Sequence, residues 1–241
     1  SLQAFADRPI EKMVEEYDLM VIDYPHVGEV SAKGLLQNLD VEDYKNELKL
    51  LHKQSVGLSH QSYNIDGHQW ALAIDAATQV CCFRHDLIQT LPKSWNDIID
   101  LAKQKRVIWP LKPIHAISSF YSIYNNLTNE FNPKDKNFIE KKVGIQTLKM
   151  MKRISAYLID ECFVMDPIKT AEILSETEDF FYSPYTYGFS NYSRKGYRKN
   201  LLTYGNVIDL SNKGPYGTHL GGTGIAISNK SQHKELALEY S

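Results

Sequence analysis

Short, unbroken runs of apolar residues, each followed by polar residues and then by a helical pattern, set the strongest constraint on this fold. Residues 19–22 lead into Asp23, residues 70–74 lead into Asp75, and residues 107–109 lead into a proline-containing turn before Lys112. Apolar runs without alternation are typical of strands covered on both faces, and helical segments between strands are typical of crossover units. The pattern predicts an α/β fold whose sheets are mainly parallel and flanked by helices.

Three further signals place helices along the chain. Ser94 and Asp97 have the spacing of a capping box, and Asp166 with Pro167 supplies an N-cap and a proline at the first helical position. Apolar residues three or four apart predict one buried face on a long helix over 145–158. These residues are Ile145, Leu148, Met151, Ile154 and Leu158.

The composition of the chain excludes several classes of function. With 241 residues the chain has room for one large domain or two small lobes, and a formal net charge of −2 gives no basic footprint for nucleic acid. No apolar run approaches the length of a membrane span. Cys81, Cys82 and Cys162 fit neither a disulfide framework nor a metal spacing, so we expect small buried side chains.

The familiar motifs of catalysis do not occur in the sequence. There is no Gly-x-Ser-x-Gly elbow, no His-Glu-x-x-His helix and no Walker-type lysine loop. Gly222-Thr-Gly begins like a dinucleotide fingerprint, but Ile227 stands where a third glycine belongs. We therefore expect no catalytic residues, no metal and no cofactor.

Residues 180–194 form an aromatic segment that predicts ligand binding. Pro184 is expected to interrupt a sheet ladder and Gly188 to favour a turn, so a strand over 180–182 would run into a loop lined with phenols. Tyrosine offers a ring for stacking and a hydroxyl for bonding, which suits a small polar ligand. We expect Tyr185 and Tyr187 to contact ligand; the alternative is that several of the tyrosines pack in the interior, as expected for Tyr182 and Tyr192.

Polar residues also gather just past the predicted strands. Ligands of open α/β sheets bind beyond the carboxyl ends of the strands, so these residues predict one shared crevice. They are Asp23, Tyr24, His26, Asp75, Lys112 and Tyr185. The glycine-rich residues 217–224 fit either a chain crossing between two lobes or a flexible loop before a strand.

Four stretches, in this order, resemble the extracellular solute-binding proteins of bacterial ABC importers, especially the carbohydrate-type group. They are residues 17–36, which contain Gly34-Leu-Leu, residues 66–95, which end in Pro92-Lys-Ser-Trp, the tyrosine-rich segment, and residues 221–237, which contain Gly-Ile-Ala-Ile-Ser. The resemblance implies a two-lobed, type II periplasmic-binding-protein-like fold with crossing hinge strands and ligand held in the cleft. The first lobe would take residues 1–76 and 222–241 and be incomplete, and the second lobe would take residues 77–221.

The resemblance and the strand-end pattern together give a set of expected ligand contacts. They come from the first loop, the two crossings and the second lobe. The residues are Asp23, Tyr24, His26, Asp75, Thr78, Trp109, Lys112, Tyr185, Tyr187, Asn191, His219, Gly222 and Thr223.

The implied function is the substrate-binding component of an ABC-type importer that delivers a small polar solute to membrane permease subunits. A sugar or oligosaccharide is the first expectation, because aromatic rings stack on pyranose faces while carboxylates and amides bond hydroxyls. Lys112, His26 and Arg194 favour an organic anion as the competing ligand. The resemblance further implies a monomer that binds no nucleic acid, in the periplasm or outside the cell, with a lipid anchor as one option. Two alternatives stay open, an enzyme on the same two-lobed fold and a ligand-sensing module.

Overall fold

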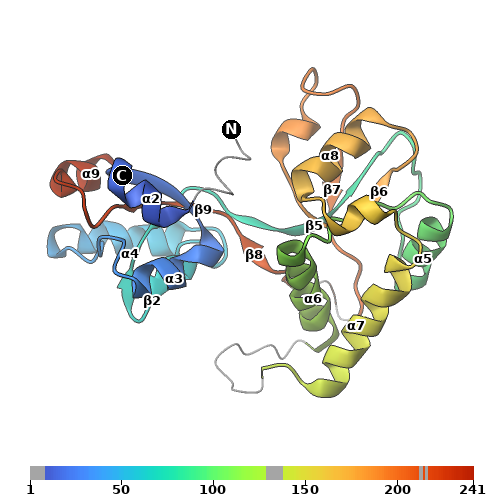
Figure 1. Cartoon of the computed structure of the whole chain (residues 1–241), viewed down its shortest axis with the longest axis horizontal. Helices are drawn as coiled ribbons and strands as arrows, with labels where there is room; N and C mark the ends of the chain where they lie inside the picture. Colours follow the sequence, from blue (N-terminus) through green and yellow to red (C-terminus); the bar gives the residue numbers. More distant parts are fainter. Residues whose placement is uncertain (1–8, 129–137, 212–213, 215–216) are drawn as a thin grey trace. The chain divides into compact units, whose positions relative to one another are not determined.

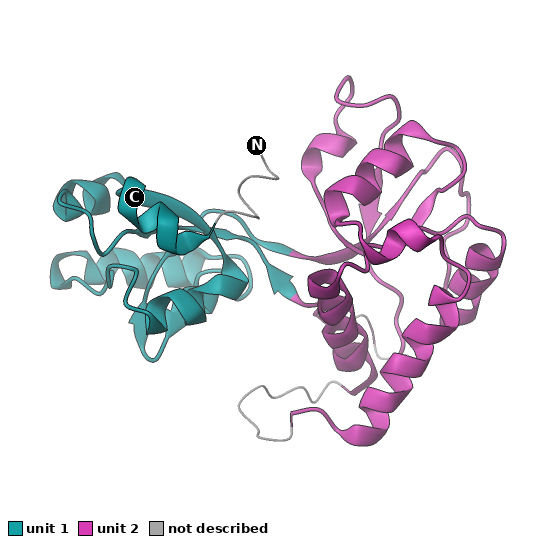
Figure 2. Cartoon of the chain, in the orientation of Figure 1, with its two compact units in different colours: residues 1–77, 220–241 teal, residues 78–219 magenta. Residues whose placement is uncertain are grey.

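The structure, a computed structural model, describes residues 9–128, 138–211, 214 and 217–241 (Figure 1). The chain divides into two compact units (Figure 2). Unit 1 comprises Ser1–Ala77 and Leu220–Ser241, and unit 2 comprises Thr78–His219. The main chain therefore passes from one unit to the other twice, and unit 1 is assembled from two segments that are distant in sequence.

Unit 1 is built around a sheet in which the strand order is β1 (Leu19–Asp23), β9 (Thr223–Ile227) and β4 (Leu72–Ala73). A small hairpin joins β2 (Asn64–Ile65) to β3 (His68–Gln69), and β8 (Leu220–Gly221) lies in the second crossing. The hairpin turn consists of Asp66 and Gly67, both at positive φ, which a two-residue turn requires. The helices of unit 1 are α2 (Ile10–Glu16), η1 (Tyr24–His26), α3 (Val27–Ala32), η2 (Glu42–Tyr44), α4 (Lys45–Gln54), η3 (Gln61–Tyr63) and α9 (Lys234–Tyr240).

The sheet of unit 1 carries an apolar cluster on each of its faces. Successive residues of a strand point to opposite faces, and the neighbours Ala226 and Ile227 of β9 belong to two different apolar clusters. Ala226 packs in the cluster that includes Val14 of α2 and Val30 of α3. Ile227 packs with Ala237 of α9 on the other side. The continuous apolar runs predicted burial on two faces, which is correct only in part, because Val21 of β1 is 38% exposed and Ile74 after β4 is 55% exposed.

Unit 2 contains a sheet of β6 (Tyr182–Tyr187), β5 (Ala77–Phe83) and β7 (Thr203–Gly205) in that order. The helices α6 (Pro113–Thr128) and α7 (Lys141–Ser155) pack against each other along one side of the unit (Figure 1). The helices of unit 2 are α5 (Trp95–Lys103), α6 (Pro113–Thr128), α7 (Lys141–Ser155), η4 (Asp160–Phe163), α8 (Pro167–Glu176) and η5 (Ser190–Ser193).

Both predicted helix starts are confirmed. At α5, Ser94 Oγ accepts a hydrogen bond from the Asp97 backbone N–H (3.2 Å), and the Asp97 carboxylate accepts one from the Ser94 N–H (2.9 Å). At α8, the Asp166 carboxylate accepts from the Lys169 N–H (2.8 Å) beside Pro167. Each cap satisfies a backbone donor that has no partner within its helix.

The prediction of mainly parallel sheets is wrong for these strands, although the α/β class is right. The pairings β1–β9, β4–β9, β2–β3, β5–β6 and β5–β7 are all antiparallel. Residues 107–109 form no named strand, and Val107 makes a parallel bridge to Tyr182. The error has a physical cause, because an unbroken apolar run reports burial on two faces and carries no information about strand direction.

The prediction that Pro184 ends a strand is also wrong. β6 continues through Pro184 to Tyr187, and Tyr182 to Thr186 are buried. The register shifts between Cys82, which pairs with Ser183, and Val80, which pairs with Thr186. Pro184 lies in this bulge, where a missing N–H leaves no ladder bond unmade.

The predicted apolar stripe on α7 is correct only in its C-terminal half. Ile154 is buried, but the side chain of Leu148 is 58% exposed and Ile145 is exposed too. The buried residues of the helix are Gly144, Thr147 and Ile154. Small residues thus face the interior at the N-terminal end of α7, and the leucine and isoleucine spacing does not identify that face.

The cysteines are buried, as predicted. Cys81, Cys82 and Cys162 are free and lie in the apolar core of unit 2. Burial raises the pKa of the Cys81 thiol to about 11 and raises the pKa values of Cys82 and Cys162 as well. Thiols of this kind carry little thiolate at neutral pH and are poor nucleophiles.

Arg84 is the one buried cation in the described residues, and its guanidinium links three parts of unit 2. It is 1% exposed, and it donates to the carbonyls of Leu174 (3.2 Å) and Thr177 (2.8 Å) at the end of α8. Its other N–H groups hold both carboxylate oxygens of Asp86 at 2.8 and 2.6 Å. The helix C-terminus is a favourable place for this charge, because its carbonyls lack partners within the helix.

Among the described residues, no helix is long and apolar enough to cross a membrane.

We predict that Arg84→Ala lowers the free energy of unfolding by about 3 kcal/mol, because it leaves buried carbonyls without donors and opens a cavity. Arg153→Ala is the matched control, since Arg153 is exposed on α7, and it should change the free energy by less than about 0.5 kcal/mol. Urea unfolding measures both. Equal effects of the two substitutions would contradict the structural role of Arg84.

Candidate functional site

Each unit carries a cluster of polar side chains close to the points where the chain crosses. We call them the unit 1 cluster and the unit 2 cluster. The unit 1 cluster consists of Asp23, Tyr24, Tyr63, Asp75, Gly222 and Thr223, and the unit 2 cluster consists of Thr78, Gln79, Ser119, Tyr121, Ser122, Tyr187, Thr218 and His219.

The unit 1 cluster is organised by the first residues of β9. Asp23, at the end of β1, pairs with Thr223 in the antiparallel register. On the other side of β9, the Thr223 carbonyl accepts from the N–H groups of Ile74 (3.0 Å) and Asp75 (3.3 Å). The Asp75 carboxylate accepts from the Thr223 N–H at 2.6 Å. The sheet therefore brings Asp23 and Asp75 to the two sides of a single strand.

Gly222 needs the conformation that only glycine adopts easily. Its φ is +115°, and a Cβ atom there would lie 2.9 Å from Asp75 Oδ1. Its carbonyl accepts from the Tyr24 N–H (3.0 Å) and from the Tyr63 hydroxyl (3.2 Å). Gly222 is thus a junction of the unit 1 cluster, which explains the glycine at this position without a phosphate-binding role.

Burial shapes the electrostatics of the unit 1 cluster. It raises the pKa of Asp23, an effect that the neighbouring Asp75 reinforces and His26 opposes. It also raises the pKa of Tyr63, whose ring packs edge-on against Tyr24 with centroids 6.3 Å apart. Burial disfavours the charged form of the Asp23 carboxyl, and hydroxyl groups of a ligand that donate to it would stabilise that form.

The unit 2 cluster is a hydrogen-bonded chain between β5 and α6. Gln79 is buried, and its amide donates to Ser119 Oγ (3.1 Å) and accepts from Ser122 Oγ (2.6 Å). Ser122 Oγ in turn accepts from the His219 backbone N–H at 2.9 Å. The Thr218 hydroxyl donates to the Gln79 carbonyl (2.6 Å) and is hydrogen-bonded to Thr78 Oγ1. This chain fixes residues 218 and 219, which begin the second crossing.

The imidazole of His219 lies between two tyrosines. Its ring stacks on Tyr121 with centroids 5.8 Å apart and 22° between the planes. The Tyr187 hydroxyl lies 2.9 Å from Nδ1. Burial lowers the pKa of His219, so the neutral ring is favoured. The arrangement presents partly exposed aromatic and polar edges, which suits a ligand that has both apolar faces and hydroxyl groups.

Two of the predicted ligand residues lie in the core of unit 2. Trp109 and Tyr185 are both 0% exposed, and their rings pack 6.0 Å apart beside Trp95. Trp109 Nε1 donates to Ser119 Oγ at 3.2 Å, so it supports the unit 2 cluster from behind. Their apolar surfaces are covered by core residues, and in this structure neither ring can stack on a ligand. Tyr182 and Tyr192 are buried, as expected.

The structure distributes the other predicted residues unevenly. Asp23, Tyr24, Asp75, Gly222 and Thr223 come together in the unit 1 cluster. Thr78, Tyr187 and His219 come together in the unit 2 cluster. The remaining three have some exposure and no hydrogen bond within the described residues that joins them to either cluster: His26 in η1, Lys112 before α6 and Asn191 in η5.

Sequence reasoning missed six residues that build these clusters: Tyr63, Gln79, Ser119, Tyr121, Ser122 and Thr218. Gln79 and Thr218 adjoin the predicted Thr78 and His219, whereas the other four are far from the strand ends at which polar residues were sought. The Ser119 and Ser122 spacing places both hydroxyls on one face of a helix, which is a usable signal. Tyr63 and Gln79 offer no comparable signal, because their partners are distant in sequence. Tyr63 bonds to Gly222, and Gln79 bonds to Ser119, Ser122 and Thr218. No group of three or more His, Cys, Asp or Glu among the described residues is placed to hold a metal ion.

Comparison with known proteins identifies the fold. No protein-family model matches the chain, and no curated protein matches it in sequence. Among solved structures, maltose-bound MalE3 of T. maritima matches with a TM-score of 0.74 and 13% identity, over 99% of this chain and 63% of that chain. A ribitol-bound ABC transporter solute-binding protein from Agrobacterium radiobacter K84 matches with a TM-score of 0.70 and 19% identity, over 99% and 63%.

A third structure, the maltotriose binding protein of Thermus thermophilus with maltotriose bound, matches with a TM-score of 0.68 and 14% identity, over 97% of this chain and 66% of that chain. The chain thus spans about 63% of the length of the first two of these proteins. The expected two-lobed periplasmic-binding-protein-like fold is confirmed, and identities this low establish the fold alone.

We predict that Gly222→Ala destabilises the protein by about 2 kcal/mol, because a side chain at this φ is strained and meets Asp75. Gly28→Ala is the matched control. Gly28 lies in α3, and a Cβ atom there would meet no other atom within 4 Å, so alanine should leave stability unchanged or raise it by up to about 1 kcal/mol. Urea unfolding of both variants measures the difference, and similar effects would contradict the constraint.

We also predict that the protein loses stability as the pH falls below about 6.5, the ordinary pKa of histidine. The folded state binds a proton at His219 less readily than the unfolded state does, so acid favours unfolding. His60 and His115 have pKa values shifted in the same direction. In His219→Gln, the loss of unfolding free energy between pH 7 and pH 5 should be smaller than in the wild type. His85→Gln, at an exposed position, should keep the wild-type slope; equal slopes in both variants would refute the role of His219.

Proposed function

We propose that this chain is the solute-binding part of an ABC-type importer and captures a sugar, oligosaccharide or polyol. The observation that carries the proposal is the likeness of fold over 95–99% of the chain to solute-binding proteins solved with such ligands. The ligands bound in those proteins include maltose, maltotriose, ribitol, mannitol and lacto-N-biose. The neighbours share a class of ligand that is rich in hydroxyl groups and carries no charge.

The unit 1 cluster supports a ligand of this class. Asp23 and Asp75 place two carboxylates at the end of the sheet, and carboxylates are strong acceptors for hydroxyl donors. The raised pKa of Asp23 reflects a carboxylate that burial leaves poorly solvated. Hydroxyl groups of a sugar would supply the missing donors without adding a charge.

The unit 2 cluster supplies complementary chemistry. The partly exposed rings of Tyr121, Tyr187 and His219 offer edges and faces for the apolar sides of a sugar ring. The hydrogen-bonded chain through Gln79 holds these groups in place before ligand binds, which reduces the entropy lost on binding.

We propose that eleven of the predicted residues contact the solute, with unit 1 and unit 2 each contributing one set. Trp109 and Tyr185 are left out because they are buried in the core. The proposed residues are Asp23, Tyr24, His26, Asp75, Thr78, Lys112, Tyr187, Asn191, His219, Gly222 and Thr223, to which the structure adds Tyr121.

An organic anion is the second ligand class. His26, Lys112 and Arg194 are exposed, and a negatively charged solute would gain from them. Exposed cations interact weakly in water, whereas Asp23 and Asp75 would repel an anion, so we favour the neutral ligand. The proposal also includes delivery to permease subunits, a monomeric binding protein and a location outside the cytoplasmic membrane.

We favour binding over catalysis for a chemical reason. The cysteines of unit 2 are buried with raised pKa values, which makes them poor nucleophiles. The ring of His219 is engaged by Tyr187 and Tyr121, and its contacts with the described residues include no serine or threonine hydroxyl that it could activate. Recovery of unchanged solute after long incubation would support binding, and chemical turnover would contradict it.

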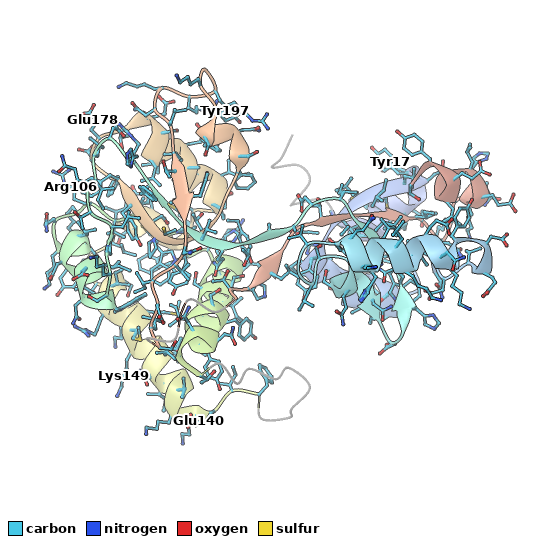
Figure 3. The ribbon with its side chains drawn as sticks, turned by 180° about the vertical axis from the view of Figure 1, so that it is seen from behind. Tyr17, Arg106, Glu140, Lys149, Glu178 and Tyr197 are labelled. Carbon is cyan, nitrogen blue, oxygen red and sulfur yellow. The ribbon has the colours of Figure 1, made fainter. Side chains whose placement is uncertain are left out.

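We predict that isothermal titration calorimetry detects binding of at least one member of a panel of maltose, maltotriose, lacto-N-biose, ribitol and mannitol. Tyr187→Ala should weaken that binding about tenfold or more, which corresponds to about 1.4 kcal/mol. Tyr17→Ala is the control, because Tyr17 is 47% exposed and projects from the surface of unit 1 (Figure 3). The affinity of the Tyr17→Ala variant for the same ligand should stay within about twofold of the wild type.

Other outcomes separate the alternatives. Binding only to carboxylates or phosphate esters would replace the neutral ligand with an anion. Binding only to cations or hydrophobic compounds would contradict both versions. Tyr187→Ala with unchanged affinity, in a variant that keeps its melting temperature, would remove Tyr187 from the proposed contacts.

A further inference from the structure

A cavity lies within unit 1, under the helix α4. It has a volume of about 450 Å³, which is within the range of about 300–1,000 Å³ that is typical of small-molecule sites. All of its lining residues come from positions 40–69, and none of them belongs to the two clusters described above. Its geometry is therefore defined by unit 1 alone.

The helix α4 packs in an unusual way. None of its residues is buried, although a helix of ten residues is marginal in water and usually depends on an apolar face packed against the core. The face that lines the cavity consists of Lys45, Leu48, Lys49 and His52, at the spacing of one helical stripe. A stripe that is mostly cationic and polar thus faces a space that the core does not fill.

The opposite wall contains a buried histidine whose ring nitrogens make no hydrogen bond within the described residues. His60 is 5% exposed and lines the cavity. Its backbone is held at both ends, since Ser55 Oγ accepts from its N–H (3.1 Å) and its carbonyl accepts from Gln69 Nε2 (3.0 Å). Neither ring nitrogen makes a hydrogen bond to a residue that the structure describes, and the nearest ring is that of His52, with centroids 6.1 Å apart. A buried polar side chain usually has a partner, so the His60 ring marks a place for one.

Two amides lie on the same wall. Gln69 is buried and uses its amide nitrogen for the carbonyls of His60 and Ala71, while no described residue donates to its Oε1. Asn64 lines the cavity from the neighbouring strand β2. The wall therefore offers an acceptor, an amide and an imidazole for hydroxyl groups.

The formal charges of Asp40, Glu42, Lys45 and Lys49 in the lining cancel, but one of these four groups has no partner among the described residues. Asp40 is engaged by His68 Nδ1 (2.9 Å) and by the Gln69 N–H, and Glu42 is paired with Lys45 at 3.1 Å. Lys49 has no ion pair among the described residues. A metal ion is disfavoured, because no group of three or more suitable ligands is assembled in the described part of the chain. A carboxylate would give Lys49 the partner that it lacks among the described residues.

We propose that the cavity under α4 is a second ligand site, which takes a small hydroxylated carboxylate. The carboxylate pairs with Lys49, and the hydroxyl groups bond to His60, Asn64 and Gln69. Such a ligand fills the space between α4 and the body of unit 1, and it provides the contact that the apolar residues of α4 do not make. The proposal does not depend on the ligand or the transport role proposed above.

The test compares gluconate with sorbitol, which has the same six-carbon polyol chain without the charge. Two-dimensional ¹H–¹⁵N NMR should show saturable shifts of amides in residues 40–69 with gluconate, and an affinity for sorbitol at least tenfold weaker at the same amides. Shifts at Tyr187 or His219 report the other site separately. Equal affinity for the two probes at residues 40–69, or no saturable shift with gluconate, would overturn the proposal.

Two variants and a control connect the binding to the lining. Lys49→Gln, at an exposed position that should leave the fold intact, is expected to weaken gluconate binding about tenfold, and His60→Asn should weaken it at least threefold. Lys53→Gln is the matched control, because Lys53 is exposed on α4 but does not line the cavity; its affinity should stay within twofold. Equal effects of Lys49→Gln and Lys53→Gln would show general attraction to a basic helix and overturn the site.

Discussion

The pairing of β9 with β1 and β4 is the interaction on which the rest of the structure depends. β9 arrives from the far end of the sequence and inserts between two strands that have no other described partner in the sheet of unit 1. Its side chains complete the apolar clusters on both faces of the sheet. The sheet of unit 1 is therefore complete only with the segment that follows unit 2 in the sequence, and closing it joins residues about 200 positions apart.

The same strand also creates the unit 1 cluster. Because β9 is central and antiparallel, its first residues lie beside the last residue of β1 and the residues that follow β4. Thr223 and Gly222 consequently contact Asp75, Tyr24 and Tyr63 through backbone groups. The unit 1 cluster lies where β9 pairs with β1 and β4. The strand pairing that stabilises unit 1 therefore also fixes the positions of Asp23 and Asp75.

The predictions from sequence succeeded where the physics is local. The capping residues of α5 and α8 bond to atoms three residues away, so spacing alone reveals them. The predictions failed where the surroundings of a residue depend on residues that are distant in sequence. The rings of Trp109 and Tyr185 have the composition of a ligand surface, yet each is covered by the other and by Trp95. Pro184 is tolerated because of a bulge whose register depends on β5, about a hundred residues earlier in the chain.

The sequence by itself determined the α/β class, the burial of the cysteines and of most of the apolar runs, the helix starts and the presence of polar residues beyond the strands. These properties follow from composition and from spacing along the chain. The tertiary structure alone decided the antiparallel order of the strands, which aromatic rings are buried, and the joining of Gln79, Ser122 and His219 into one chain of hydrogen bonds. The reason is that hydrogen bonds and packing act over a few ångströms in space, and only the folded chain brings residues from its two ends within that distance.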